Sequence, residues 1–508
     1  MQNSGKKLAT TAILMVFVTL MSKALGMFRD ILLASTFGTA TEAIAYEAAS
    51  RLPITLFDFA LGGVVTAAFI PIFNELMVKE GREKAFAFAN KYFNLILAVT
   101  VCITVLGVVF SGELVSFLAP DISAEAKTLA SALCKLMFPM IIFTGIAFCF
   151  VGILQSFEKY TLPAIMSLVS NLVMVLYFFT LCSRFGVWGL SLALLVGWFL
   201  QAAIQAPSAH KLGFRYSPTL NFSDVYIKRA LKMAFPILVC SWLLPVCNVI
   251  NTRFASGFED GSAITMVNYA NRLYIIIVGI FSFVATNLLF PKISRAEAGG
   301  DNKGAREFTA SSLKILLYIM IPLSMGIYLL AEPLIRVIYM RGEFNAHDAE
   351  VTAAVLKLFA LGIPFMSMNE VLTKLFFAMQ KVKAPMVASV ISIGVNIALV
   401  SLLVKFIGFD GIALASSITI AVCTLINFAL ISKSGALFSK TDVFDILKMC
   451  LATALMCVSV FLVIAKTDMQ DVFTVILCGA IGILVYAMAI LVLRPTEIRS
   501  FIKRGKND

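Results

Sequence analysis

The sequence predicts an all-α polytopic membrane protein of about 14 transmembrane helices, with two six-helix lobes related by a parallel repeat and two further C-terminal helices. Composition, the spacing of apolar runs and internal similarity support this fold class. The chain of 508 residues is 60% hydrophobic and 14% charged, whereas soluble domains average about 45–50% apolar residues. A soluble globular fold is therefore excluded.

Each expected helix is an apolar run long enough to cross the hydrocarbon core, which requires about 20 residues. The first run is too long for a removable signal peptide and lacks its small-residue cleavage site, so it is expected to remain as a transmembrane helix. An even number of spans places both termini on one side. The runs lie at residues 9–36, 43–72, 86–110, 126–154, 161–183, 187–207, 229–256, 262–290, 307–332, 349–378, 385–406, 411–432, 443–465 and 472–493.

The distribution of Lys and Arg predicts on which side of the membrane the two termini lie. Cations gather in one alternate set of loops, including Lys79, Arg82, Arg215 and the basic C-terminal tail, whereas the other set carries acids such as Glu113 and Asp121. Because positively charged loops stay in the cytoplasm, both termini are expected to be cytoplasmic. The net charge of +12 is spread over short loops, which disfavours a nucleic-acid partner.

The chain resembles itself at an offset of 221–222 residues across most of two six-helix halves. Arg51 aligns with Arg272, and further matches pair Pro163 with Pro385, Gly186 with Gly408 and Gly189 with Gly411. A period of six helices preserves membrane orientation, so the repeat is parallel and its lobes are expected to flank a central cavity. The expected parts are an N-terminal lobe at 1–222, a C-terminal lobe at 223–438 and, at 439–508, helices 13 and 14 with the basic tail.

Six charged residues inside or beside the apolar runs are the candidate substrate-binding residues: Lys23, Arg29, Asp30, Arg51, Asp58 and Arg272. Each charged residue at the centre of a membrane helix costs about 2.5–3.5 kcal/mol on insertion scales, so such residues usually face a cavity, a partner or a substrate. Four cations and two aspartates sum to +2 and match a pyrophosphate diester, whose oxygens arginine can bind in pairs.

The structural alternative is that these residues are internal ion pairs, Arg29 with Asp30 and Arg51 with Asp58. Their spacing permits both pairs. That reading leaves Lys23 and Arg272 without a role, so the sequence favours an anion site.

Enzymatic motifs are missing from the sequence. It contains no Walker-type GxxxxGK[ST] run, nucleophile elbow, HExxH pair or clustered Cys and His set. The ten cysteines lie mostly in apolar runs without a CxxC pair and are interpreted as small hydrophobic residues. The chain is thus expected to be a transporter with no catalytic residue, metal or cofactor.

Several segments resemble one known family. They are Ser22-Lys23-Ala24-Leu25-Gly26-Met27-Phe28-Arg29-Asp30, Arg51-Leu52-Pro53 with Ala68-Phe69-Ile70-Pro71, Tyr269-Ala270-Asn271-Arg272-Leu273, Arg341-Gly342-Glu343-Phe344, Gly362-Ile363-Pro364 and Phe376-Phe377-Ala378 with Pro385. Over nearly the whole chain the sequence resembles the MurJ family, also called MviN, of the multidrug/oligosaccharidyl-lipid/polysaccharide exporter (MOP) superfamily.

The resemblance implies a flippase that moves lipid II, an undecaprenyl-pyrophosphate-linked disaccharide pentapeptide, across the bacterial cytoplasmic membrane by alternating access. It places essential cavity cations at Lys23, Arg29 and Arg272, with Asp30 as their neighbour, and assigns helices 13 and 14 to a groove for the polyprenyl tail. Lipid II and membrane lipids are the implied partners, and peptidoglycan-synthesis enzymes are further candidates.

The sequence departs from the family pattern at several positions. Lys23 replaces an arginine, Phe57 stands where some members carry another arginine, and Asn271 replaces an aspartate. Some members are thought to bind sodium through carboxylates on helices 7, 11 and 12. These runs lack Asp and Glu here, and Asn251 is the nearest substitute, so the membrane potential is the expected driving force.

Three alternatives remain open at this stage. A flippase for another polyprenyl-linked glycan would use the same pyrophosphate site. A multidrug exporter predicts acidic cavity residues and twelve helices, and a non-transporting scaffold predicts that the cavity cations are dispensable.

Overall fold

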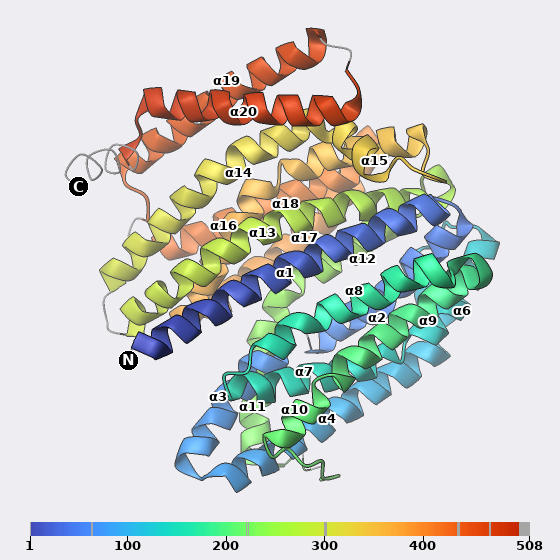
Figure 1. The fold of residues 1–508 in the computed structure, drawn as a ribbon, viewed down its shortest axis with the longest axis vertical. Helices are drawn as coiled ribbons and strands as arrows, with labels where there is room; N and C mark the ends of the chain where they lie inside the picture. Colours follow the sequence, from blue (N-terminus) through green and yellow to red (C-terminus); the bar gives the residue numbers. More distant parts are fainter. Residues whose placement is uncertain are drawn as a thin grey trace. The chain divides into compact units, whose positions relative to one another are not determined.

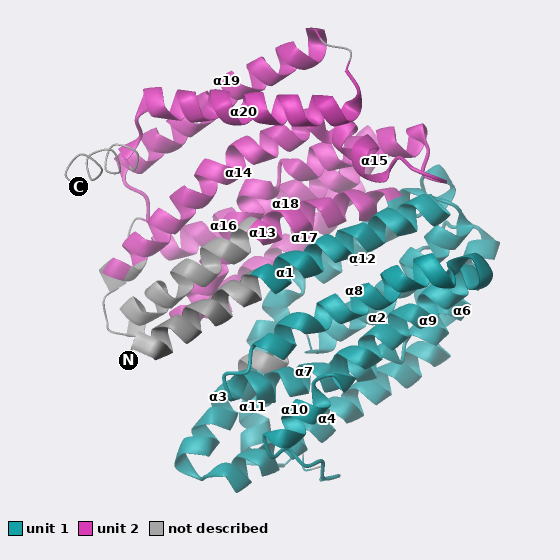
Figure 2. Ribbon diagram, viewed as in Figure 1, with its two compact units in different colours: residues 1–265 teal, residues 266–508 magenta. Residues whose placement is uncertain are grey.

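The computed structural model describes residues 2–61, 64–219, 221, 223–298, 302–433, 437–466 and 469–496. Every regular element in these ranges is a helix (Figure 1). Contacts divide the chain into two compact units, residues 1–265 and 266–508 (Figure 2). This division follows contacts, whereas the predicted lobes follow the repeat, so the lobe boundary between residues 222 and 223 remains a prediction.

The described residues of the first unit form twelve α-helices and a short 3-10 turn at Glu259–Gly261. The helices are α1 (Gln2–Phe37), α2 (Thr41–Leu61), α3 (Val64–Lys79), α4 (Arg82–Val109), α5 (Ser111–Leu118), α6 (Ala124–Met137), α7 (Met140–Ser156), α8 (Thr161–Thr180), α9 (Cys182–Ala203), α10 (Ala206–Lys211), α11 (Val225–Ser241) and α12 (Leu243–Ala255). Within this unit α1 packs mainly on α8, whereas α11 and α12 pack on α2, α3 and α5.

The second unit contains almost all of α13 and the remaining helices. They are α13 (Ala263–Ala298), α14 (Asn302–Tyr339), α15 (Ala346–Ala360), α16 (Ile363–Ala378), α17 (Lys383–Ile407), α18 (Asp410–Ser432), α19 (Lys440–Lys466) and α20 (Asp471–Leu493). The pair α17 and α18 and the pair α19 and α20 form antiparallel hairpins, and α14 contacts α15, α16, α19 and α20.

The predicted apolar runs all coincide with one helix or two consecutive helices. Within the described residues, 10 helices are long and apolar enough to cross a membrane, and the number is 12 if each of two bent pairs is one span. These pairs are α11 with α12, bent by 43°, and α15 with α16, bent by 47°. The polytopic all-α fold is confirmed, and the count of 14 spans remains a prediction.

The repeat is visible in the backbone as well as in the sequence. Glu158 and Gln380 have φ values of 58° and 57°. Gly186 (φ 50°, ψ −141°) and Gly408 (φ 63°, ψ −141°) share one conformation, which side chains rarely allow. Both pairs are separated by 222 residues. Helices α6 and α7 therefore correspond to α15 and α16, and α8 and α9 correspond to α17 and α18.

Gly189 and Gly411, matched by the repeat, are both required by close helix packing. A Cβ atom on Gly411 would lie 2.6 Å from the Leu403 carbonyl carbon and 2.7 Å from the Val404 nitrogen. A Cβ atom on Gly189 would lie 2.4 Å from the Tyr177 hydroxyl. At Gly411 the obstacle is backbone, which cannot rotate away.

We therefore expect Gly411→Ala to destabilise the protein by about 1–3 kcal/mol, the usual range for overpacking. Gly394→Ala is the matched control, because Gly394 also lies in a helix of this hairpin and a Cβ there meets nothing within 4 Å. Thermal unfolding of the purified full-length protein in detergent measures the difference. Equal melting temperatures for the two variants would contradict the packing argument.

In the first unit, Asp224 joins the start of α11 to α4. Its carboxylate accepts hydrogen bonds from the backbone N–H groups of Tyr226 and Ile227 at 2.9 and 3.3 Å and pairs with Lys91 at 2.6 Å. Burial opposes ionisation of Asp224, but the hydrogen bond from Lys91 and the two backbone N–H groups outweigh it and lower the pKa of the carboxyl.

Asp224 should therefore make the stability of the protein depend on pH. Because its pKa is lower in the folded state, its contribution is present above the ordinary Asp pKa of about 4 and is lost as the pH falls through the folded value. Asp224→Asn, which can still cap the helix, should cost about 1 kcal/mol at pH 7. The difference in free energy of unfolding between wild type and Asp224→Asn should vanish in acid. Unfolding experiments at several pH values measure it.

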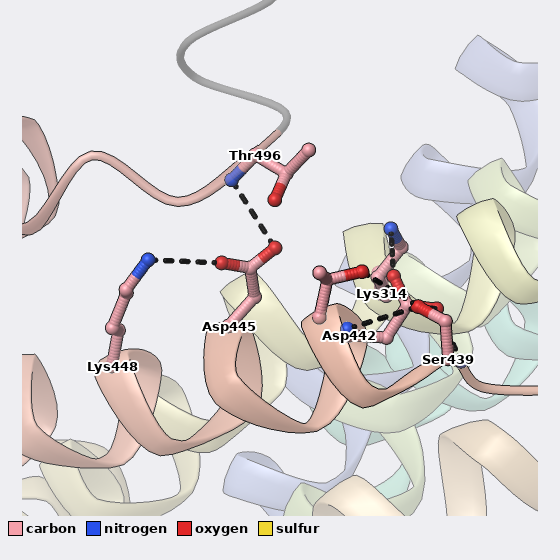
Figure 3. Close-up of polar contacts among 7 residues, drawn as sticks. Lys314, Ser439, Asp442, Asp445, Lys448 and Thr496 are labelled. Carbon is pink, nitrogen blue, oxygen red and sulfur yellow. Dashed lines mark hydrogen bonds and ion pairs between the residues drawn. The ribbon is translucent and has the colours of Figure 1, made fainter.

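Figure 3 draws the polar contacts around the start of α19, one of which ties the C-terminal hairpin of α19 and α20 to α14. Lys314 of α14 pairs with Asp442 of α19 at 2.6 Å, and both side chains are largely buried. Asp442 also accepts hydrogen bonds from Ser439. Asp445, which is 1% exposed, accepts from Lys448 and from the backbone N–H of Thr496, each at 3.2 Å. We call these residues the hairpin anchor.

Candidate functional site

The best-defined part of the candidate site is a polar network between α1 and α8. Arg29 donates from Nε and Nη2 to Oδ1 of Asp30, at 3.0 and 2.8 Å, and from Nη1 to Oδ1 of Asn171 at 2.9 Å. The Asp30 side chain is 4% exposed and that of Arg29 is 24% exposed. The guanidinium is thus held in one orientation while part of it remains accessible.

Small and polar residues allow this network to form. A Cβ atom on Gly26 would approach Nδ2 of Asn171 to 3.3 Å, so the glycine allows the amide to lie against α1. Asn171 Nδ2 donates to the carbonyl oxygen of Ser22 at 3.3 Å, and the hydroxyls of Ser22 and Ser167 are 2.6 Å apart. Asn171 therefore links the backbone of α1 to the charged end of Arg29.

The Arg29–Asp30 contact is the ion pair that the structural alternative anticipates. It does not remove Arg29 from consideration, because a guanidinium carries about five N–H donors. The bonds to Asp30 and Asn171 use three of them, and Nη1 also makes a long contact of 3.9 Å with the Met174 sulfur. A carboxylate that holds an arginine in position can also compete with an anionic ligand for it. The pairing of Arg29 with Asp30 therefore suits reversible binding of an anion.

The remaining candidates of the first unit lie on α1 and α2. Lys23 is half-buried on α1, about two turns before Arg29. Arg51 and Asp58 are both half-buried on α2, which also carries the buried Glu47. All three lie inside helices at the positions that the sequence predicts.

Arg272 lies on α13 in the second unit, beside a buried aromatic cluster. Its Cζ atom is 5.9 Å from the ring centre of Tyr269, three residues earlier on the same helix. The Tyr269 ring stacks on Tyr339 at 5.1 Å and meets the edge of Phe344 at 5.7 Å. These three rings are at most 1% exposed. Arg272, a half-buried residue, thus has its guanidinium beside a group of buried, closely packed rings.

The aromatic cluster gives a structural role to the Arg341-Gly342-Glu343-Phe344 segment. Gly342 has φ 58°, and this turn brings Phe344 back against Tyr269 and Tyr339. Directly after it, Asn345 and Asp348 form a capping box that starts α15.

Sequence reasoning missed Asn171, Ser167 and the aromatic cluster. One signal was present, because Ser167, Ser170 and Asn171 recur at helical spacing within an apolar run and so form a polar stripe on one face. Tyr269 and Phe344 stand in two of the segments that resemble the MurJ family, but the sequence does not indicate that these rings and Tyr339 pack together.

Metal ligands do not gather in the described part of the chain. No group of three or more His, Cys, Asp or Glu side chains that could hold a metal ion occurs there. The charged side chains described above can bind an anion electrostatically and by hydrogen bonds.

A polytopic helical fold with charged residues inside its helices is typical of membrane transporters. A family model described as lipid II flippase MurJ matches residues 33–481. The chain therefore belongs to the MurJ family.

Individual relatives agree with this assignment. The chain is 29% identical over 442 residues to a probable lipid II flippase MurJ of Bdellovibrio bacteriovorus, covering 85% of this chain and 84% of that protein. It is 27% identical over 492 residues to a protein of the same description from Thermotoga maritima, covering 96% of this chain and 97% of that protein.

Solved structures show the same fold. The structure described as lipid II flippase MurJ in an inward closed conformation matches with a TM-score of 0.83 and 26% identity, over 96% of this chain and 100% of that one. An inward-facing multidrug transporter of the MATE family in the MOP superfamily matches with a TM-score of 0.69 and 14% identity, over 84% of this chain and all of that one. The latter supports the fold alone.

Proposed function

We propose that this protein is a lipid II flippase of the bacterial cytoplasmic membrane and that it moves the undecaprenyl-pyrophosphate-linked peptidoglycan precursor from the inner to the outer leaflet by alternating access. The family match over residues 33–481 supports this function. The structural observation that supports binding of a pyrophosphate is that the guanidinium of Arg29, within a membrane helix, is oriented by its neighbours and partly accessible.

In this proposal Lys23, Arg29, Arg51 and Arg272 bind the pyrophosphate. Asp30 competes with the phosphate oxygens for Arg29, which favours release, and Asp58 tunes the charge of the site. Arginine suits the two phosphates because its planar donors match their oxygens in pairs. Lys23 contributes a point charge. The membrane potential drives the step, and both termini are cytoplasmic.

Helices α19 and α20 provide the groove for the polyprenyl tail in this proposal. They pack on α14 through buried side chains that include Leu317, Leu330, Met449 and Met456. Their outward faces carry exposed apolar side chains such as Leu451, Leu455, Phe461, Ile476 and Ile483. An isoprenoid chain could lie along such a surface without exposing polar groups.

Complementation tests the proposal. Cells depleted of their own MurJ should grow when they produce this protein and should not grow with Arg29→Ala or Arg272→Ala at equal protein levels. Failure of the wild type to rescue would contradict the lipid II assignment. Full rescue by both variants would contradict the anion site.

A further inference from the structure

A second basic site lies in the first unit, away from the α1–α8 network. It is a cleft of about 590 Å³ between the first turns of α4 and the segment 213–219. Its charged lining residues are Arg82, Lys91, Arg215 and Glu83, and Lys91 is paired with Asp224. Phe86 and Ala87 give the cleft an apolar part. We call it the basic cleft.

The basic cleft has fixed walls. Asn90 of α4 donates to the carbonyl oxygen of Arg215 at 3.0 Å and accepts from the N–H of Ser217 at 2.8 Å. One turn later, Asn94 donates to the carbonyl oxygens of Ser217 and Thr219 at 2.7 and 3.0 Å. Two asparagines that are at most 8% exposed thus bind the segment much as a neighbouring strand would.

The cations of the basic cleft are also positioned. Arg82 donates from Nη2 to the carbonyl oxygen of Leu212 at 2.5 Å, and its Cζ lies 5.6 and 6.0 Å from the ring centres of Phe86 and Phe157. Lys91 is held by Asp224 at 2.6 Å. Arg215 is fixed through its backbone, and its side chain is exposed.

The length of α4 predicts that the basic cleft lies at the depth of lipid headgroups. Helix α4 has 28 residues, which corresponds to about 42 Å, whereas the hydrocarbon core is about 30 Å thick. The excess places the charged first turns of α4 outside the core. Arg82 and Arg215 belong to the loops that the sequence predicts to be cytoplasmic, where anionic lipids attract basic segments.

We propose that the basic cleft binds the phosphodiester headgroup of an anionic membrane lipid. Arg82 and Arg215 contact the phosphate oxygens, and Ser217 and Thr219 offer hydroxyls, whereas the charge of Lys91 is balanced by Asp224. The apolar part formed by Phe86 and Ala87 accommodates the glycerol and the first acyl carbons. This site is separate from the pyrophosphate site and does not depend on the proposed function.

Native mass spectrometry of the full-length protein in detergent tests the proposal. The probes are phosphatidylglycerol, phosphatidylcholine with the same acyl chains and soluble glycerol 3-phosphate. Wild type should retain phosphatidylglycerol in preference to phosphatidylcholine. Arg215→Gln should weaken that retention about fivefold, which corresponds to about 1 kcal/mol for one basic residue at a membrane surface. Glu83→Gln should strengthen it, since it removes a negative charge from the lining of the cleft.

Lys228→Gln is the matched control, because Lys228 is an exposed cation of the same unit outside the basic cleft. It should retain phosphatidylglycerol like wild type. Equal losses for Arg215→Gln and Lys228→Gln would overturn the site in favour of diffuse attraction. Equal retention of the two lipids would overturn anion recognition, and displacement of the lipid by glycerol 3-phosphate would overturn the lipid as the natural occupant.

Discussion

Arg272→Ala is expected to weaken lipid II binding by about 100-fold and to abolish growth of MurJ-depleted cells, because truncating one partner of a desolvated charge pair costs about 2–5 kcal/mol. Arg341→Ala removes the same charge from an exposed position of the same unit and should leave binding unchanged. Titration of lipid II into the purified protein measures both. Equal affinities for the two variants would show that Arg272 does not contact the substrate.

The contact between Arg272 and Tyr269 extends this prediction. Tyr269→Leu removes the ring beneath the guanidinium, and a cation–π contact is worth about 1 kcal/mol, so lipid II affinity should fall about fivefold. Tyr269→Phe retains the ring and should bind like wild type. In an Arg272→Ala background, Tyr269→Leu should have no further effect on affinity. A further loss of affinity in that background would show that Tyr269 stabilises the fold in general and does not act through Arg272.

Arg29→Ala is expected to have an effect of similar size, about 100-fold in lipid II affinity. Arg29→Lys retains the charge but cannot reach Asp30 and Asn171 together as the guanidinium does, so it should lose roughly tenfold. Transport of lipid II in vesicles that contain the purified protein measures the result. Arg184→Ala, at an exposed position of α9, is the control for loss of one positive charge.

Arg29→Ala also leaves Asp30 buried without its described partner, so loss of activity could reflect misfolding. The double variant Arg29→Ala with Asp30→Asn removes both charges of the pair. It should unfold closer to the wild-type temperature than the single variant and still fail to transport lipid II. Recovery of transport in the double variant would show that the pair is structural.

The helical segments were predictable because bilayer thickness imposes a length on apolar runs, and every run coincides with described helices. The interruptions were harder to predict. Pro139 and Gly362 lie at the breaks between α6 and α7 and between α15 and α16, but Pro53 lies inside α2 without ending it. A proline or glycine permits a break, and packing in three dimensions decides whether one occurs.

The charged residues of the candidate site were predictable and their neighbours were not. The cost of charge in hydrocarbon makes Arg29 and Arg272 conspicuous in the sequence. Asn171 is 142 residues from Arg29, and Phe344 is far from Tyr269 along the chain. The sequence contains no local pattern that specifies which distant helix supplies the partner, so these contacts required the structure.

The hairpin anchor makes the C-terminal pair of helices part of the second unit rather than an appendage. Helices α19 and α20 lie outside the repeat, yet Lys314, inside the repeated part, pairs with Asp442 of α19. A chain that ended after α18 would lose that carboxylate and also the apolar side chains of α19 and α20 that pack on α14. We therefore expect such a truncated chain to be less stable than the full-length protein.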